Sequence, residues 1–437
     1  MSLPARFSDL KREIAAAYPD FEERATRAWI EIIEQLKEVT ADISNHGVDY
    51  IPQVNYSDLE TLSKEDIDKI KRRGCVVIRD IVNDTEAKDW KTSLEDYITA
   101  NPGLDGYPAN NPIFYEIFWT KAQLQARSHP NILSTTLWLT NLYHIKGESV
   151  EGMDLSNPLS YADRFRIRRP GPQHTNILPP HVDGPTIERW EDPALREYFS
   201  EILSGNWHLH DPYEMGGRIK ARNSHYERPN QASIFRSFQG WLALSETGPT
   251  EGTIQFFPSV ALANAYIILR PFFRPLPSAD ATSIMDAKNW EFDISSPDFP
   301  GIHPLDGGYI GPRPTPALHP HLRLETTMTS VPKMRPGDAV FWHCDVIHAV
   351  EEEHKGQGDS AVIFIPAVPQ TPYNQAYVEK QRETFLSGRR PPDMPQGKCA
   401  EFPEGKREDH YVGFGTLDDI SLAGRKAMGF PVGVVQG

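Results

Sequence analysis

The sequence is poor in cysteine and has no long apolar run. Its 437 residues include only three cysteines, Cys75, Cys344 and Cys399, too few and too scattered for a disulfide framework or a CxxC metal site. This scarcity predicts a reducing compartment and a cytoplasmic location. The N-terminus lacks the apolar core of a signal peptide, and no stretch of about 18 uncharged apolar residues follows. We therefore expect neither secretion nor a membrane span.

An excess of positive charge and the common nucleotide and hydrolase motifs are also lacking. Lys and Arg number 45 against 60 Asp and Glu, so the net charge of −15 has the wrong sign for binding phosphate backbones. Nucleic acid is therefore not an expected partner. The chain has no GxSxG, GxGxxG or GxxxxGK(S/T) motif, which argues against α/β-hydrolases, dinucleotide-binding enzymes and P-loop proteins.

What is present is a folded chain rich in aromatic residues, with 9 Trp, 16 Tyr and 20 Phe. Its first part has helical patterning. Apolar residues at helical spacing predict a helix over 21–45, and Ser63 begins a capping box that predicts a helix over 63–73. The β-branched segment 75–82 predicts a strand that must join a larger sheet, and Asn83 caps the next helix.

Beyond Arg164 the pattern changes to a period of two residues. Gly/Pro turns separate the predicted strands, with no regular helices between them, which favours an antiparallel sandwich or barrel. The predicted strands are 164–171, 233–247, 252–260, 339–350 and 360–368. We therefore predict an α+β protein with a mainly helical N-terminal region (1–160), a β core (161–368) with an inserted helix (186–203), and a C-terminal extension (369–437).

Histidine chemistry is the strongest signal that remains. His181 and Asp183 are two residues apart, so on an extended chain their side chains point to the same face and can share a metal ion. A third ligand could come from His343, His348 or His354 in the segment MRPGDAVFWHCDVIHAVEEEH. Two His and one carboxylate form the facial triad of non-haem Fe(II) oxygenases. Taken alone, an HxD pair is more often a surface turn.

The surrounding motifs strengthen the metal interpretation. They are SKEDIDKIKRRGCVVIRDIV, the HVD pair, GWLALSETGPTEGTIQFFPS and GDAVFWHCDVIH. Together they resemble the phytanoyl-CoA dioxygenase-like branch of the Fe(II)/2-oxoglutarate oxygenases over residues 63–368, and most nearly the uncharacterised YbiU-like oxygenases. The resemblance implies a double-stranded β-helix, the cupin-like jelly-roll barrel, with the N-terminal helices packed on its outside.

The resemblance also implies a set of ligands and an activity. His181 and Asp183 match the proximal metal ligands and His348 the distal one, whereas His343 occupies a position often filled by a histidine that is not a ligand. His354, in an acidic stretch, is expected to be exposed. The implied cofactors are Fe(II), 2-oxoglutarate as cosubstrate and O2. The implied activity is oxidation, by default hydroxylation, of a small organic molecule, with succinate and CO2 as coproducts.

The sequence departs from the family where 2-oxoglutarate is anchored. The family has an Arg about eleven residues after the distal His, but here residues 358–361 read GDSA, with no basic side chain. Because Arg is the best partner for a carboxylate, another Arg must replace it if this cosubstrate is used. The candidates are Arg236 between two phenylalanines, and Arg168 or Arg166 in RFRIRRPG, with Ser360 adding a hydroxyl.

Two alternatives to the dioxygenase interpretation stay open. The missing Arg leaves room for a jelly-roll metalloenzyme that does not use 2-oxoglutarate, and the barrel could instead be a noncatalytic ligand-binding or scaffold protein. A homo-oligomer also stays open. Two other histidine groups, His208, His210 with Asp211, and His319 with His321, have ligand-like spacing but are more often structural.

Overall fold

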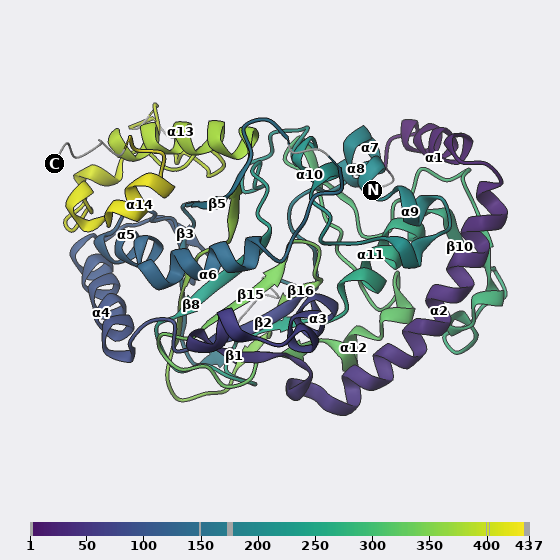
Figure 1. Cartoon of the computed structure of the whole chain (residues 1–437), viewed down its shortest axis with the longest axis horizontal. Coiled ribbons are helices and arrows are strands. Elements are labelled where there is room, and N and C mark those ends of the chain that lie inside the picture. Colours follow the sequence, from purple (N-terminus) through teal and green to yellow (C-terminus); the bar gives the residue numbers. More distant parts are fainter. Residues whose placement is uncertain (1–2, 148–149, 173–177, 399, 402, 432–437) are drawn as a thin grey trace.

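The computed structural model describes residues 3–147, 150–172, 178–398, 400–401 and 403–431. Cys399 therefore lies outside the described residues. Helices and several β-sheets make up the structure, which confirms the predicted α+β class. Figure 1 shows the strands at the middle of the molecule, with the N-terminal helices α1 and α2 at one end of its long axis and the C-terminal helices α13 and α14 at the other.

The largest sheet has eight strands, and it holds the predicted entry strand. In order across the sheet these are β1 (Gln53–Asn55), β2 (Cys75–Arg79), β15 (Ala339–His343), β8 (Phe238–Ala243), β18 (Ser360–Phe364), β6 (Phe165–Arg168), β4 (Phe114–Tyr115) and β3 (Gly106–Tyr107). Strand β2 pairs in parallel with β1 and antiparallel with β15, so the expectation that it joins a larger sheet is confirmed. The sheet is open, because its described strands end at β1 and β3 without pairing to each other.

A three-stranded sheet lies across a cavity from the large one. Its strands are, in order, β14 (Thr329–Ser330), β9 (Ile254–Phe256) and β16 (His348–Val350). Side chains from β9 and β16 line the same cavity as side chains from β6, β8 and β15, so the cavity lies between the two sheets. This arrangement brings residues from opposite ends of the sequence to one place.

The remaining strands form short antiparallel pairs. These are β10 (Phe273–Pro275) with β11 (Trp290–Phe292), β12 (His303–Leu305) with β13 (Gly308–Ile310), β17 (Glu353–His354) with β7 (Gly171–Pro172), and β19 (Val368–Gln370) with β5 (Asp154–Leu159).

The helices are α1 (Arg6–Ala17), α2 (Phe21–His46), α3 (Lys64–Arg73), α4 (Asp84–Ala100), α5 (Lys121–Ser128), α6 (Pro130–Thr140), α7 (Glu188–Glu191), α8 (Pro193–Tyr198), α9 (Ser200–Leu203), α10 (Gly216–Ile219), α11 (Val260–Leu269), α12 (Leu324–Thr327), α13 (Pro372–Leu386) and α14 (Leu422–Ala427). Among the described residues, none of these helices has the length and apolar composition needed to cross a bilayer.

The N-terminal helices form as their capping and apolar patterns predict. Helix α2 buries its apolar face, and the Ser63 hydroxyl caps α3 by accepting a hydrogen bond from the Asp66 amide. Gly74 ends α3 with a φ of 71°, and a Cβ there would lie 2.7 Å from Val346. Its carbonyl accepts the His343 amide at 2.7 Å, so the helix end is fixed against the end of β15.

Two segments differ from the predicted elements. The expected helix over 186–203 is three short helices, α7 to α9, because Pro193 cannot continue α7. Helix α11 follows strand β9 where a continuous strand over 252–260 was expected. Nearly all of its side chains are buried, so it has no polar face and its sequence shows no helical period.

A buried ionic cluster holds the turn between β15 and β16. The Asp345 carboxylate, fully buried, accepts hydrogen bonds from Arg189 at 2.9 Å, from Arg218, and from the Asn264 amide at 3.0 Å. Although burial opposes ionisation, the two guanidinium groups hold the pKa of Asp345 well below its ordinary value. Helices α7, α10 and α11 are thereby connected to the turn that precedes His348.

We expect Asp345→Asn to destabilise the protein by about 3–5 kcal/mol, because it leaves two buried guanidinium groups without their anion. Urea unfolding followed by tryptophan fluorescence measures the loss. Glu246→Gln is the matched control: it removes an exposed carboxylate that pairs with Lys333, so it should leave the midpoint nearly unchanged. Equal midpoints for the two variants would show that the cluster does not stabilise the fold.

Candidate metal centre

His181 and His348 meet although 166 residues separate them along the chain. His348 begins β16, and each of the two residues donates its amide to the other's carbonyl at 2.9 Å, an isolated antiparallel bridge. Their ring centroids are 4.2 Å apart. Both rings are at least nine-tenths buried by residue exposure, at 9 % and 4 %. The backbone pairing therefore places two imidazoles side by side.

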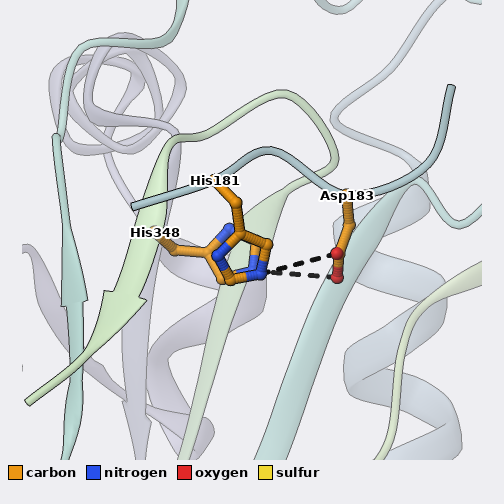
Figure 2. Close-up of side chains that lie close together, drawn as sticks. All are labelled: His181, Asp183 and His348. Carbon is orange, nitrogen blue, oxygen red and sulfur yellow. Dashed lines mark ion pairs between the residues drawn. The ribbon is translucent and has the colours of Figure 1, made fainter. Parts of the chain in front are cut away.

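Asp183 completes the group. One carboxylate oxygen lies 3.5 Å from Nε2 of His181 and the other lies 3.7 Å from Nε2 of His348. Figure 2 shows the carboxylate facing both rings. The three potential ligand atoms all lie within 4.8 Å of one another. Adjacent ligands at about 2.1 Å from a metal ion are roughly 3 Å apart, so the group is near the spacing of one face of an octahedron.

Hydrogen bonds set the protonation of the two rings. Nδ1 of His181 lies 2.7 Å from the Pro179 carbonyl, and Nδ1 of His348 lies 3.0 Å from the Val346 carbonyl. Because a carbonyl only accepts, each Nδ1 carries a proton, and Nε2 is the ring nitrogen that faces Asp183. Burial, together with the neighbouring His348, lowers the pKa of His181 to about 4, so this ring is neutral near pH 7.

The Asp183 carboxylate is ionised. Burial would raise its pKa, but His348, His181 and Arg236 outweigh burial and hold the pKa well below the ordinary value. Its side chain remains 38 % exposed toward the cavity. One carboxylate and two imidazoles form a donor set that suits a divalent first-row metal ion.

The backbone around Asp183 is held from two sides. The amide of Val182, between the two proximal residues, donates to the Pro312 carbonyl at 2.9 Å. Arg189 reaches the Asp183 carbonyl at 3.4 Å with one nitrogen while another binds Asp345. One arginine therefore connects the segment that holds His181 and Asp183 to the turn that precedes His348.

A second group with metal-like composition, His343, Cys344 and Asp345, has its donor atoms already engaged. Nε2 of His343 lies 2.9 Å from the Pro212 carbonyl, and its Nδ1 accepts the Asp345 amide at 3.0 Å. The Asp345 oxygens bind Arg189 and Arg218, and burial raises the pKa of the Cys344 thiol to about 11. This group therefore has a structural role.

A cavity of about 900 Å³ opens beside the triad. Its wall on the eight-stranded sheet carries several buried hydrogen-bond donors that have no partner among the described residues. They are Arg166 Nε, Gln239 Nε2, Trp241 Nε1 and Trp342 Nε1. Strand register puts these four residues on one face of the sheet. Gln239 and Trp241 are two residues apart on β8, and Trp342 of β15 lies opposite Gln239. On the other side of β8, Trp241 lies opposite Phe364 of β18, and Val362, two residues before Phe364, lies opposite Arg166. The wall therefore combines residues that line the cavity with buried donors whose hydrogen-bonding capacity is unused among the described residues.

The arginines named as anchors differ in what they contact. Arg168 donates to the carbonyls of Gly252 at 2.9 Å, Glu351 at 2.6 Å and Glu352 at 3.2 Å, and is not among the described residues that line the cavity. Arg236 lines it, with ion pairs of 3.7 Å to Asp183 and 3.8 Å to Asp163.

Arg166 has no carboxylate within ion-pair distance in the described chain. It is 1 % exposed, and its guanidinium donates to the Ser360 hydroxyl at 3.3 Å, which in turn donates to Thr247 at 3.0 Å. Burial, with Arg168 alongside, lowers the pKa of Arg166 to about 9. The cation is therefore poorly compensated without an anion in the cavity.

Some residues differ from expectation. His354 is 2 % exposed, so the expected exposure is wrong: its acidic neighbours are solvated, but its own ring turns inward in β17. Trp241 and Trp342 are buried as expected, yet they also line the cavity. Arg228 and Arg313 in the cavity wall were not anticipated, because they lie in irregular segments where no periodicity indicates which way a side chain points.

Comparisons with known proteins place the chain in a family. It is 29 % identical over 441 residues to the uncharacterised protein YbiU of Escherichia coli strain K12, covering 98 % of this chain and 96 % of that one. The crystal structure of GlcNAc Inducible Gene 2 from Candida albicans superposes with a TM-score of 0.86 at 28 % identity, covering 100 % of this chain and 92 % of that one. A candidate oxidoreductase from Salmonella typhimurium LT2 gives a TM-score of 0.78 at 27 % identity, covering 98 % and 99 %. A family model described as Gig2-like matches residues 1–430, and this chain therefore belongs to the Gig2-like family.

Proposed function

We propose that this protein is a non-haem Fe(II)- and 2-oxoglutarate-dependent dioxygenase that oxidises, by default hydroxylates, a small organic molecule. The observation that carries the proposal is the placement of a 2-His-1-carboxylate group at one end of a cavity whose adjoining wall presents buried, unpartnered donors. The description of the Salmonella relative as a candidate oxidoreductase agrees with it. On this proposal the two facing sheets are an elaborated, open form of the double-stranded β-helix.

His181, Asp183 and His348 would hold the iron. Their lone pairs converge, and the carbonyls behind Nδ1 of each ring fix the ring orientation, as outer contacts do in metal sites. Three protein ligands on one face leave the other face open for cosubstrate and O2. When bound, iron and 2-oxoglutarate would supply the oxidation, in which 2-oxoglutarate, O2 and a substrate C–H bond give succinate, CO2 and a C–OH bond.

Arg166 would anchor the distal carboxylate of 2-oxoglutarate. It is the cavity arginine on the large sheet that lacks a carboxylate partner among the described residues, and Ser360 orients it. Gln239 Nε2 offers a further donor on the same face. Of the candidate arginines, Arg168 has donors engaged by carbonyls and Arg236 pairs with Asp183, so we propose Arg166 as the anchor.

The protein's own side chains would exclude water and position the reacting parts. Trp241 and Trp342 form an apolar wall next to the triad, with their indole N–H groups available to acceptors. Arg236 compensates the charge of Asp183, and Arg189 fixes the backbone of that residue. A substrate bound toward the remaining walls would present its C–H bond to the open face of the triad.

Anaerobic titration tests the metal and the cosubstrate. Fe(II) followed by 2-oxoglutarate should produce the weak visible band of the chelate, and His181→Ala or His348→Ala should abolish it. Removing one metal-binding side chain should weaken Fe(II) binding by more than the roughly 10–100-fold that results from losing an outer contact. His46→Ala, at an exposed helix end, is the matched histidine control and should retain the band.

Two results would contradict the proposal. Iron binding that depends on His181 without any band would favour a metalloenzyme that does not use 2-oxoglutarate. Wild-type protein that binds no iron would favour a noncatalytic ligand-binding or scaffold protein.

The intensity of the same band, followed as 2-oxoglutarate is added, measures how tightly the anchor binds this cosubstrate. Arg166→Gln should raise the 2-oxoglutarate concentration for half-maximal band by about 10–100-fold, because hydrogen bonds to a charged group contribute about 1.5–3 kcal/mol. Fe(II) affinity should not change. Ser360→Ala, which removes only the orienting hydroxyl, should have a smaller effect.

Arg168→Gln is the matched control, on the same strand and similarly buried. It should lower stability, through its lost contacts to carbonyls, but leave 2-oxoglutarate affinity unchanged. A shift in Arg236→Gln but not in Arg166→Gln would instead assign the anchor to Arg236.

A further inference from the structure

A second group of arginines lines the cavity on a different wall from Arg166. Arg313 follows the β12–β13 hairpin, and Arg228 donates its Nε to the carbonyl of Tyr309 in β13 at 3.2 Å. Both line the cavity that contains the triad. The hairpin therefore brings two cations together at a site that the proposed iron and cosubstrate contacts do not use.

Arg313 is held beside the triad by its backbone. Its amide donates to the Gly301 carbonyl at 2.8 Å, and the carbonyl of the preceding Pro312 accepts the amide of Val182, which lies between His181 and Asp183. Its side chain is half-buried, and its Nε is fully buried without a hydrogen-bond partner in the described chain. The position of this arginine relative to the triad is thus fixed, while its guanidinium remains available.

Neither arginine forms a close ion pair, although Asp183 acts on both from a longer distance. Among the residues that the structure describes, no carboxylate lies within 4.0 Å of the guanidinium of Arg228 or of Arg313. The other cavity arginines outside the large sheet differ in this respect, because Arg236 and Arg390 pair with aspartates.

Burial lowers the pKa of both arginines. At Arg228 the carboxylates of Asp306, Glu188 and Asp183 oppose this shift and Arg313 adds to it, and at Arg313 Asp183 opposes it. In a chain with a net charge of −15, two arginines that line one cavity without a close ion pair among the described residues create a local positive field that attracts an anion.

From this placement we infer that the substrate carries an anionic group, a carboxylate or a phosphate, which Arg313 and Arg228 bind while another part of the molecule faces the triad. The inference rests on the proposed function, because it assigns the substrate of that site. Guanidinium groups bind both kinds of anion through paired N–H donors, so the chemistry is shared. Anchoring the anion beside Asp183 would fix which C–H bond reaches the open face of the triad.

Inorganic phosphate is the first probe. It is titrated by calorimetry into protein loaded anaerobically with Fe(II) and 2-oxoglutarate, and acetate is titrated in parallel to distinguish a phosphate from a carboxylate. Wild-type protein should bind one of the two, and Arg313→Gln and Arg228→Gln should each weaken that binding roughly ten-fold or more. Arg313→Lys should recover part of it. Arg274→Gln, which removes an exposed arginine paired with Glu291, is the matched control and should bind as wild type does.

The outcomes separate this inference from the proposed function. No binding of either anion by wild type, or binding as tight as wild type by both Gln variants, overturns the inference. The chelate band is measured in the same variants, and its half-saturating 2-oxoglutarate concentration should stay within about two-fold of wild type. A large rise would assign the two arginines to the cosubstrate and also overturn the inference. If wild type gives no band, the proposed function fails, and titration of the unloaded protein still decides whether the arginines bind an anion.

Discussion

The candidate site depends on one buried carboxylate, that of Asp345. It lies in the turn between β15 and β16 and binds Arg189 and Arg218, which come from the helical insertion and the segment after it. Arg189 also holds the carbonyl of Asp183. His181 is fixed by its backbone bridge to His348, but Asp183 lies in irregular backbone beyond that bridge, so this link supplies the rigidity that a ligand set needs. The segment that carries His348 thus has a structural Asp three residues before the proposed ligand.

The cavity is unusual in its balance of donors and acceptors. Buried polar groups in proteins are normally hydrogen-bonded, yet the large-sheet wall leaves donors of Arg166, Gln239, Trp241 and Trp342 without partners among the described residues. All four are donors, whereas other parts of the cavity lining hold the unpartnered acceptors Glu116 Oε2 and Gln231 Oε1. Buried polar atoms without partners cost stability in the free protein, and a bound ligand that pairs with them would offset that cost.

The sequence predicts the parts of this structure that follow a period or a cap. The i, i+2 spacing of His181 and Asp183, the Ser63 cap and strand β2 required no tertiary information. Choosing His348 over His343 from the residues alone was not possible, because their difference lies in tertiary contacts: the Pro212 carbonyl and the Asp345 amide occupy both ring nitrogens of His343. Helix α11 was missed because a helix buried on all sides has no amphipathic period.

On the proposed function, strand pairing would account for the lack of an arginine on β18. In the family pattern the anchor stands about eleven residues after the distal His, which here is the start of β18, where Ser360 lies. Strand β6 pairs with β18, and neighbouring strands are about 4.8 Å apart, so a long side chain from β6 on the same face can reach the same space. Arg166 does so, since its guanidinium contacts the Ser360 hydroxyl. A sequence motif specifies where a residue stands along the chain, whereas a bound ligand contacts a charged group in space, whichever strand supplies that group. The absence of a basic residue at positions 358–361 therefore does not argue against 2-oxoglutarate as the cosubstrate.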